Sequence, residues 1–211
     1  MTAPFRLAAA LALLVAVAEP ASATTLAPLT VDQMTDASDV VARGTVEEIW
    51  TDLDEHLHVV SFASVRVTEV LKGDALVDDY VVVETPGGVW EGAISLVAEA
   101  ARYDEGEDVV LFLASKRHGS AWGTVAMSRG KYTVRQNPAD GSDMVVRFTQ
   151  PWDKPFDHRF IPHPPAAERV SLASLESQVR ARVALGWDGK PIPGVSADHL
   201  RAINRLQPGV K

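Results

Sequence analysis

The sequence predicts a mainly β protein whose helices are short and lie at its two ends. The stretch 39–50 alternates apolar and polar residues with the two-residue period of a β-strand. The stretch 58–71 is rich in Val, Thr and Phe and alternates imperfectly, because Val60 and Phe62 place apolar groups on its second face. Turns rich in Gly, Pro and Asp follow the apolar runs, as they do between the strands of an antiparallel sheet. In contrast, the apolar residues of 172–183 recur every three or four positions, which is the period of an amphipathic helix.

The predicted elements begin with a short helix. Thr30 to Gln33 matches the capping-box pattern, and the helix is expected to end at Ser38. Strands are expected at 39–50, 58–71, 80–85, 108–114, 122–127, 131–135 and 144–148, and the segment 89–101 fits either a strand or a short helix. Gly44, inside the first strand, predicts a bulge or a sharp bend. Six or seven strands with such a bend indicate a small OB-like barrel, closed or partly open, rather than a sandwich.

A proline-rich stretch separates this barrel from the C-terminal part of the chain. Its prolines exclude regular helix and the interior of a sheet, and they are Pro151, Pro155, Pro162, Pro164 and Pro165. Trp152, Phe156, Phe160 and Ile161 lie among them, which predicts an extended strap that packs on the body. Two helices are expected to follow, at 172–183 and after Ser196, and to cover one side of the barrel.

The charge is unevenly distributed between these two parts. The formal net charge of the chain is −8; residues 24–150 hold 10 Lys and Arg against 21 Asp and Glu, and residues 151–211 hold 9 against 6. We therefore expect an acidic barrel domain at 24–150 and a basic extension of strap and two helices at 151–211 that docks on it. The overall acidity argues against a nucleic acid partner, because phosphate binding needs clustered Lys and Arg.

The first 23 residues match a signal peptide. Arg6 precedes an unbroken apolar run at 7–18, and Ala21-Ser22-Ala23 resembles a cleavage site. The apolar run is too short to cross a bilayer, so no stable membrane insertion is expected once the signal peptide is removed. The sequence therefore predicts cleavage after Ala23 and a periplasmic or secreted protein.

The chain contains no cysteine. This excludes a disulfide scaffold, a thiol nucleophile, and zinc or iron–sulfur sites held by cysteine.

Several turn and strand motifs resemble those of a known group of proteins. They are Val70-Leu71-Lys72-Gly73, Glu84-Thr85-Pro86-Gly87-Gly88, the run from Tyr103 to Leu113, and Arg129-Gly130-Lys131-Tyr132. Together they resemble exported bacterial proteins of unassigned function, whose domain is similar to the netrin-like OB module of tissue-inhibitor-type metalloprotease inhibitors. In those inhibitors an N-terminal cysteine chelates the protease zinc. This chain has no cysteine, so the resemblance implies a fold and not that mechanism.

Two clusters of side chains are candidates for metal binding. His56 and His58 are two residues apart, so on a strand they point to the same face, and Asp54 is nearby. A solvated hairpin loop is the competing interpretation. Asp104, Glu105, Glu107 and Asp108 crowd around Gly106, and there we expect a solvated acidic cap before a buried strand.

Pro86, Gly87 and Gly88 are predicted to form a tight bend, and together with Trp90 they are a candidate binding loop as the lesser alternative. No catalytic residue and no cofactor are assigned. The sequence therefore favours an exported, non-catalytic module that binds an unknown protein or peptide. A weak metal-dependent hydrolase that uses His56 and His58 is the alternative. A modulator of a secreted metalloprotease is a further alternative that rests on fold analogy alone.

Overall fold

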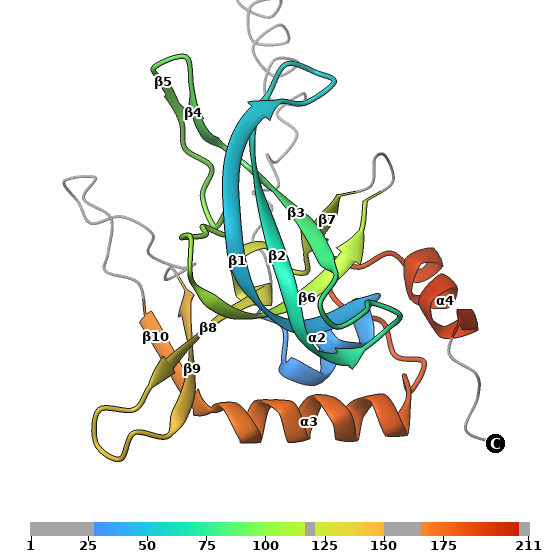
Figure 1. Ribbon diagram of the computed structural model, residues 1–211. Coiled ribbons are helices and arrows are strands. Elements are labelled where there is room, and N and C mark those ends of the chain that lie inside the picture. Colours follow the sequence, from blue (N-terminus) through green and yellow to red (C-terminus); the bar gives the residue numbers. More distant parts are fainter. Residues whose placement is uncertain (1–27, 117–120, 150–165, 207–211) are drawn as a thin grey trace, which may run out of the picture.

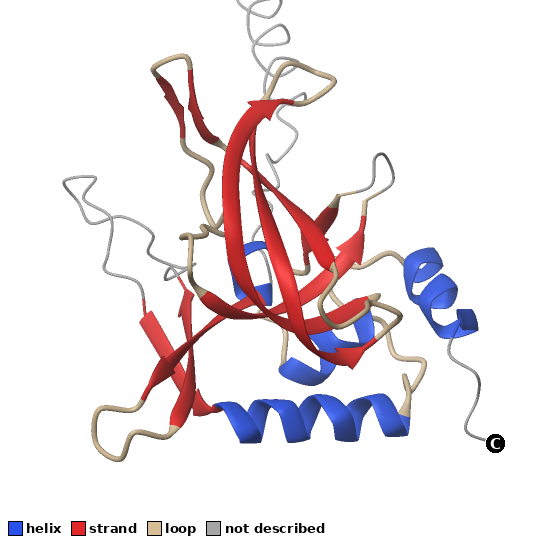
Figure 2. Cartoon of the chain, in the orientation of Figure 1, coloured by secondary structure: helices blue, strands red, loops and turns tan. Residues whose placement is uncertain are grey.

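The computed structural model describes residues 28–116, 121–149 and 166–206. Within these ranges the chain forms an eight-stranded mixed sheet, a separate two-stranded sheet, a short N-terminal helix and two C-terminal helices (Figures 1 and 2). The prediction of a mainly β chain is confirmed. The predicted signal peptide and the prolines of the predicted strap lie outside the described residues.

The strands are β1 (Val40–Leu53), β2 (Val59–Lys72), β3 (Tyr80–Pro86), β4 (Gly88–Trp90), β5 (Ala93–Ser95), β6 (Asp108–Ser115), β7 (Trp122–Thr124), β8 (Lys131–Gln136), β9 (Asp143–Thr149) and β10 (Ala166–Ser171). The helices are α2 (Val31–Ala37), α3 (Leu172–Leu185) and α4 (Ala197–Leu206), and a 3-10 turn, η1, spans Met127–Gly130.

Five strands of the large sheet close into a partial ring. Their order is β1-β2-β3-β7-β6, and β6 pairs in turn with β1. The neighbours in this ring are antiparallel except β3 and β7, which are parallel and registered through a single pair, Val83 and Trp122. Beyond β6 the sheet continues through β8 and β9 to β10.

Gly44 allows β1 to pair along both of its edges. Residues 40–45 pair with β6, while the other edge pairs with β2 across a register shift between Arg43 and Gly44. A Cβ at Gly44 would lie 2.5 Å from Arg66 O and 2.7 Å from Val65 Cγ1, so no larger residue fits. The predicted irregularity at this glycine is confirmed.

The ring separates two apolar cores. One lies inside it and consists of Val40, Ala42, Val46, Ala63, Val65, Val67, Val81, Val83, Val109, Leu111 and Leu113. The other lies between the sheet and the helices, where Leu172, Leu175 and Val179 of α3 pack against Phe112 and Tyr132 of the sheet. Helix α3 runs along one end of the ring in Figure 1. The prediction that helices cover one side of the strands is confirmed.

Three elements differ from the sequence-based expectation. The strand predicted at 122–127 ends at Thr124, because Ala126 and Met127 have positive φ angles (54° and 58°) and lead into η1. The ambiguous segment 89–101 begins with the β4–β5 hairpin and then runs irregularly. Strand β10 was not expected; it starts directly after Pro165 and pairs with β9.

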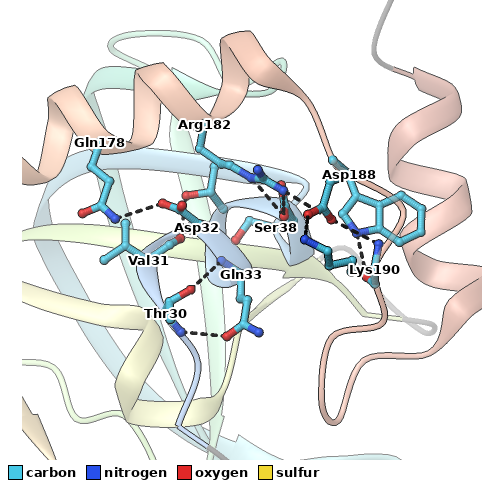
Figure 3. A network of polar contacts seen from close by, with 12 residues as sticks. Thr30, Val31, Asp32, Gln33, Ser38, Gln178, Arg182, Asp188 and Lys190 are labelled. Carbon is cyan, nitrogen blue, oxygen red and sulfur yellow. Dashed lines mark hydrogen bonds and ion pairs between the residues drawn. The ribbon is translucent and has the colours of Figure 1, made fainter.

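Helix α3 is joined to the acidic body by ion pairs. The Arg182 guanidinium donates to both carboxylate oxygens of Asp36, with Nε–Oδ1 at 2.9 Å and Nη2–Oδ2 at 2.6 Å. One turn earlier, Gln178 Nε2 donates to Asp32 Oδ1 at 2.9 Å (Figure 3). Arg180 pairs with Glu69 of β2 on the surface. These contacts have the charge signs that the sequence predicted for docking of the basic extension.

We expect Arg182→Ala to lower the free energy of unfolding by about 3 kcal/mol, because it leaves the buried Asp36 carboxylate without its cation. Arg180→Ala is the matched control. It removes a more exposed pair of the same helix and is expected to cost less than about 1 kcal/mol. Urea unfolding of both variants measures the difference, and equal losses would contradict this assignment.

Lys72, at the end of β2, caps the C-terminus of α2. The residue is only 6% exposed, and its Nζ donates to Thr35 O at 2.6 Å and Ser38 O at 2.7 Å. Burial lowers the pKa of this amine to about 8, although the Asp36 and Asp39 carboxylates oppose the shift. The neutral amine keeps two N–H donors, so both hydrogen bonds survive its deprotonation.

Stability is therefore expected to rise with pH between about 8 and 10.5. In this window the unfolded chain keeps the Lys72 proton that the folded chain has lost. Deprotonation removes the cost of burying a charged amine, which adds up to about 3 kcal/mol to the free energy of unfolding. Urea unfolding of the wild type and of Lys72→Met across this range isolates the effect. Parallel pH profiles for the two proteins would show that Lys72 is not responsible.

Candidate functional site

A pocket of about 390 Å³ lies at one end of the ring. Ile49, Ser61 and Thr85 line it from β1, β2 and β3. Side chains two positions apart on a strand point to the same face. Ser61 is two positions from the inner-core residue Ala63, and Thr85 is two positions from Val83, so the pocket continues the inner face of the ring. The remaining lining residues are Phe62, Pro86, Gly87, Gly88, Val89, Ile94, Ser95, Leu96, Val97, Ala100, Ala101, Arg102, Tyr103 and Asp104.

Gly87 and Gly88 turn the chain sharply out of β3 at the edge of the pocket. Gly87 N donates to Val59 O at 2.8 Å, and Ser61 Oγ donates to Gly87 O at 2.7 Å. The two glycines have φ angles of +89° and +146°. A Cβ at Gly88 would overlap the Ser61 hydroxyl and lie 2.9 Å from Thr51 Cγ2. The tight bend predicted from Pro86-Gly87-Gly88 is confirmed.

The β4–β5 hairpin forms one wall and exposes apolar side chains. Glu91 and Gly92 both have positive φ angles (48° and 81°), as in the type I′ turn that best matches the twist of paired strands. Ile94 of β5 is 70% exposed and Leu96, just beyond β5, is 75% exposed. Of the predicted binding loop, Pro86, Gly87 and Gly88 line the pocket, whereas Trp90 does not.

The chain after the hairpin, residues 96–104, forms a second, irregular wall that is held at several points. Thr85 Oγ1 donates to Ala101 O at 2.9 Å, and Ser128 N donates to Glu99 O at 2.8 Å. The Glu99 side chain pairs with Arg129 of η1 at 3.3 Å. Glu99 has a left-handed φ of 62°, a conformation that costs about 1–2 kcal/mol in a residue other than glycine. The surrounding contacts therefore fix this wall against its local preference.

A buried ion pair supports the end of this wall. Glu107 accepts hydrogen bonds from Thr133 Oγ1 at 2.5 Å and Lys131 Nζ at 2.6 Å. Lys131 also donates to Arg102 O and lies 4.9 Å from the centre of the Tyr103 ring. Burial lowers the pKa of Lys131 while its pair with Glu107 opposes the shift, and burial raises the pKa of the Tyr103 hydroxyl.

The expectation of a solvated acidic cap is therefore wrong for Glu107, because β8 supplies Lys131 and Thr133 to a carboxylate that is only 7% exposed. It holds for Asp104 and Glu105, which are exposed, whereas Asp108 is half-buried and pairs with Arg43 at 2.6 Å.

The chemistry of the pocket suits binding. The hydroxyls of Ser61 and Thr85 already donate to backbone carbonyls, so neither faces a base that would activate it as a nucleophile. The other lining side chains are mostly apolar, and Arg102 and Asp104 are the charged groups among them. Pockets of this size with apolar walls and few polar groups are typical of ligand sites.

The metal candidates His56, His58 and Asp54 lie on the β1–β2 hairpin, and they do not form a complete set of metal ligands. Asp54 Oδ1 accepts from the backbone N of His56 and of His58, both at 2.8 Å, and Oδ2 lies 3.2 Å from His58 Nδ1. The backbone bond from His58 is the main reason why the pKa of Asp54 is lowered. The two imidazole centres are 6.1 Å apart. In ranges 28–116, 121–149 and 166–206, no three His, Cys, Asp or Glu residues are grouped so that they could hold a metal ion.

The apolar wall of the pocket was not predicted from the sequence. Ile94, Leu96 and Val97 lie in the segment 89–101, whose mixed pattern fits either a strand or a short helix and so does not assign these residues to a wall. The available signal was the combination of several aliphatic residues with the nearby Gly87-Gly88 and Glu91-Gly92 turns, which is typical of a short hairpin.

No protein-family model and no curated protein matches this chain. Over the described residues, no helix is both long and apolar enough to cross a membrane.

Replacing Gly88 with alanine tests how tightly the bend is built. We expect Gly88→Ala to lower the free energy of unfolding by about 3 kcal/mol, through overlap with Ser61 and Thr51 as well as strain at positive φ. The control is Gly92→Ala, which also has a positive φ but no atom within 4 Å of the added Cβ. It is expected to cost about 1 kcal/mol. Equal losses in urea unfolding would show that the bend tolerates a side chain.

Proposed function

We propose that this protein is a non-catalytic binding module that takes an apolar side chain of a peptide or protein segment into the pocket at the end of its ring. The observation that carries this proposal is a preformed apolar pocket with exposed aliphatic side chains at its edge. Val89, Ile94 and Leu96 line the pocket and are largely exposed to solvent, so a partner that covers them removes apolar surface from water.

The rigidity of the site supports the same function. Hydrogen bonds to other parts of the chain hold the base of the β4–β5 hairpin at Gly87, through Val59 and Ser61, and hold the irregular wall through Thr85 and Ser128. A site that is already ordered loses little conformational entropy when it binds a ligand.

We further propose that the ring is a barrel of the OB type. Its five strands, and its opening at the single registered pair between β3 and β7, fit the description of a five-stranded, partly open Greek-key barrel. The netrin-like resemblance of the turn motifs supports this assignment. Ligands of OB barrels contact the second and third strands and the loop between the first two, and here β2 and β3 line the pocket beside the β1–β2 hairpin.

The proposed setting is extracytoplasmic. The Arg6 n-region, the apolar run at 7–18 and the small residues up to Ala23 support export and cleavage of the first 23 residues. The absence of cysteine is compatible with an oxidising compartment.

Selection from a random heptapeptide display library tests the proposed binding. The immobilised protein is expected to enrich peptides with large aliphatic or aromatic residues. Leu96→Ser is expected to weaken the binding of a synthetic copy of an enriched peptide about tenfold, which corresponds to the loss of one interface anchor. Fluorescence anisotropy of the labelled peptide measures this loss.

The matched control is Leu76→Ser, which removes a similarly exposed leucine from the connection between β2 and β3, at the other end of β2. It is expected to leave binding unchanged. The proposal is wrong if no peptide is enriched, or if Leu96→Ser binds the enriched peptide as tightly as the wild type.

A further inference from the structure

Carboxylates surround the pocket on several sides. Asp104 lines it and is followed by the exposed Glu105. Glu91 lies in the turn of the β4–β5 hairpin, and Glu55 lies in the turn of the β1–β2 hairpin. Figure 1 shows both hairpins projecting at the same end of the ring. A ligand in the pocket would therefore have negative charge on either hairpin and at the end of the irregular wall.

The neighbouring cations are already paired within the protein. Lys116 pairs with Glu84 at 2.5 Å, Arg129 with Glu99 at 3.3 Å, and Lys131 with Glu107 at 2.6 Å. These pairs cancel and leave Glu91, Asp104 and Glu105 facing solvent.

Arg102 is the basic side chain that lines the pocket, and it offsets one of these carboxylates. Of the six Asp and Glu in 86–108, Glu99, Glu107 and Asp108 are paired with Arg129, Lys131 and Arg43, which leaves three carboxylates against Arg102. The local potential therefore remains negative after the ion pairs are taken into account, and it disfavours an anionic ligand.

We propose that the segment bound in this pocket carries an aliphatic side chain flanked by lysine or arginine. This rests on the proposed binding function and adds the charge of the partner to it. The apolar lining takes the aliphatic side chain, because most of the lining side chains are apolar and the hydroxyls of Ser61 and Thr85 already donate to backbone carbonyls. The flanking cations face the carboxylates of the two hairpins and of Asp104 and Glu105, where opposite charges steer encounter and select the partner.

Three labelled peptides that differ only in their flanks test the proposal. The probes are acetylated Gly-Lys-Val-Leu-Val-Lys-Gly, Gly-Ser-Val-Leu-Val-Ser-Gly and Gly-Glu-Val-Leu-Val-Glu-Gly, titrated by fluorescence anisotropy at low and at high salt. At low salt the lysine peptide is expected to bind about fivefold more tightly than the serine peptide, as two exposed ion pairs would give. The glutamate peptide is expected to bind most weakly, and high salt is expected to reduce the differences.

The double variant Glu91→Gln, Glu105→Gln changes two carboxylates that do not line the pocket, and it is expected to remove most of the preference for lysine while it keeps the affinity for the serine peptide. Asp74→Asn is the matched control. It removes one exposed carboxylate from the loop between β2 and β3, at the far end of β2, and is expected to leave the preference intact. Urea unfolding of each variant verifies that the fold is retained.

The outcomes separate the two proposals. Equal binding of the lysine and serine peptides, both lost in Leu96→Ser, would overturn the charge preference and leave the apolar pocket as the binding site. A lysine preference that survives the double variant would also overturn it, because the charge would then act elsewhere. If neither the serine nor the lysine peptide binds, and display selection also enriches no peptide, the proposed function itself fails.

Discussion

The whole fold depends on how closely two strands approach at Gly44. Strand β1 pairs with β2 along one edge and with β6 along the other, and both pairings include Gly44. Because a Cβ would lie 2.5 Å from Arg66 O, any side chain would force β2 away from β1. The pairing of β1 with β6 is what closes the ring, encloses the inner core and leaves the opposite face of the sheet for the helices. One small residue thus makes two separate cores possible on a single sheet.

The pocket follows from the same closure. Strands β1 and β2 extend beyond the ring. The inner-facing residues at the end of β1 and at the start of β2, before Ala63, therefore have no opposing strand to cover them. The β4–β5 hairpin and residues 96–104 partly take that place. Ser61 donates to Gly87 O, directly before the hairpin, and Thr85 donates to Ala101 O in the irregular wall. The buried pair of Glu107 and Lys131 anchors the far end of the irregular wall. An apolar site is therefore built into the frame of the fold and is not confined to a free loop.

Local signals predict much of this structure from the sequence, and non-local pairings account for what they miss. The capping box at Thr30 and Gln33, the bend at Gly44 and the apolar stripe of α3 each depend on residues a few positions apart, and each is confirmed. The burial of Glu107 depends on Lys131, which lies 24 positions away on another strand. Strand β10 directly follows a run of prolines and has no clear alternation, so only its pairing with β9 identifies it. The bend at Pro86-Gly87-Gly88 was predictable, but the apolar wall that makes it part of a pocket was not.

Binding as proposed requires that the pocket exist before any ligand binds, with its walls fixed by hydrogen bonds to β2, β3 and η1. Amide hydrogen exchange of the free protein tests this requirement most directly at Gly87 N, which donates to Val59 O, and at Ser128 N, which donates to Glu99 O. We predict that both amides exchange as slowly as those in the middle of β2. Exchange as fast as that of Gly92, in the exposed hairpin turn, would show that the walls open freely and that the pocket is not preformed.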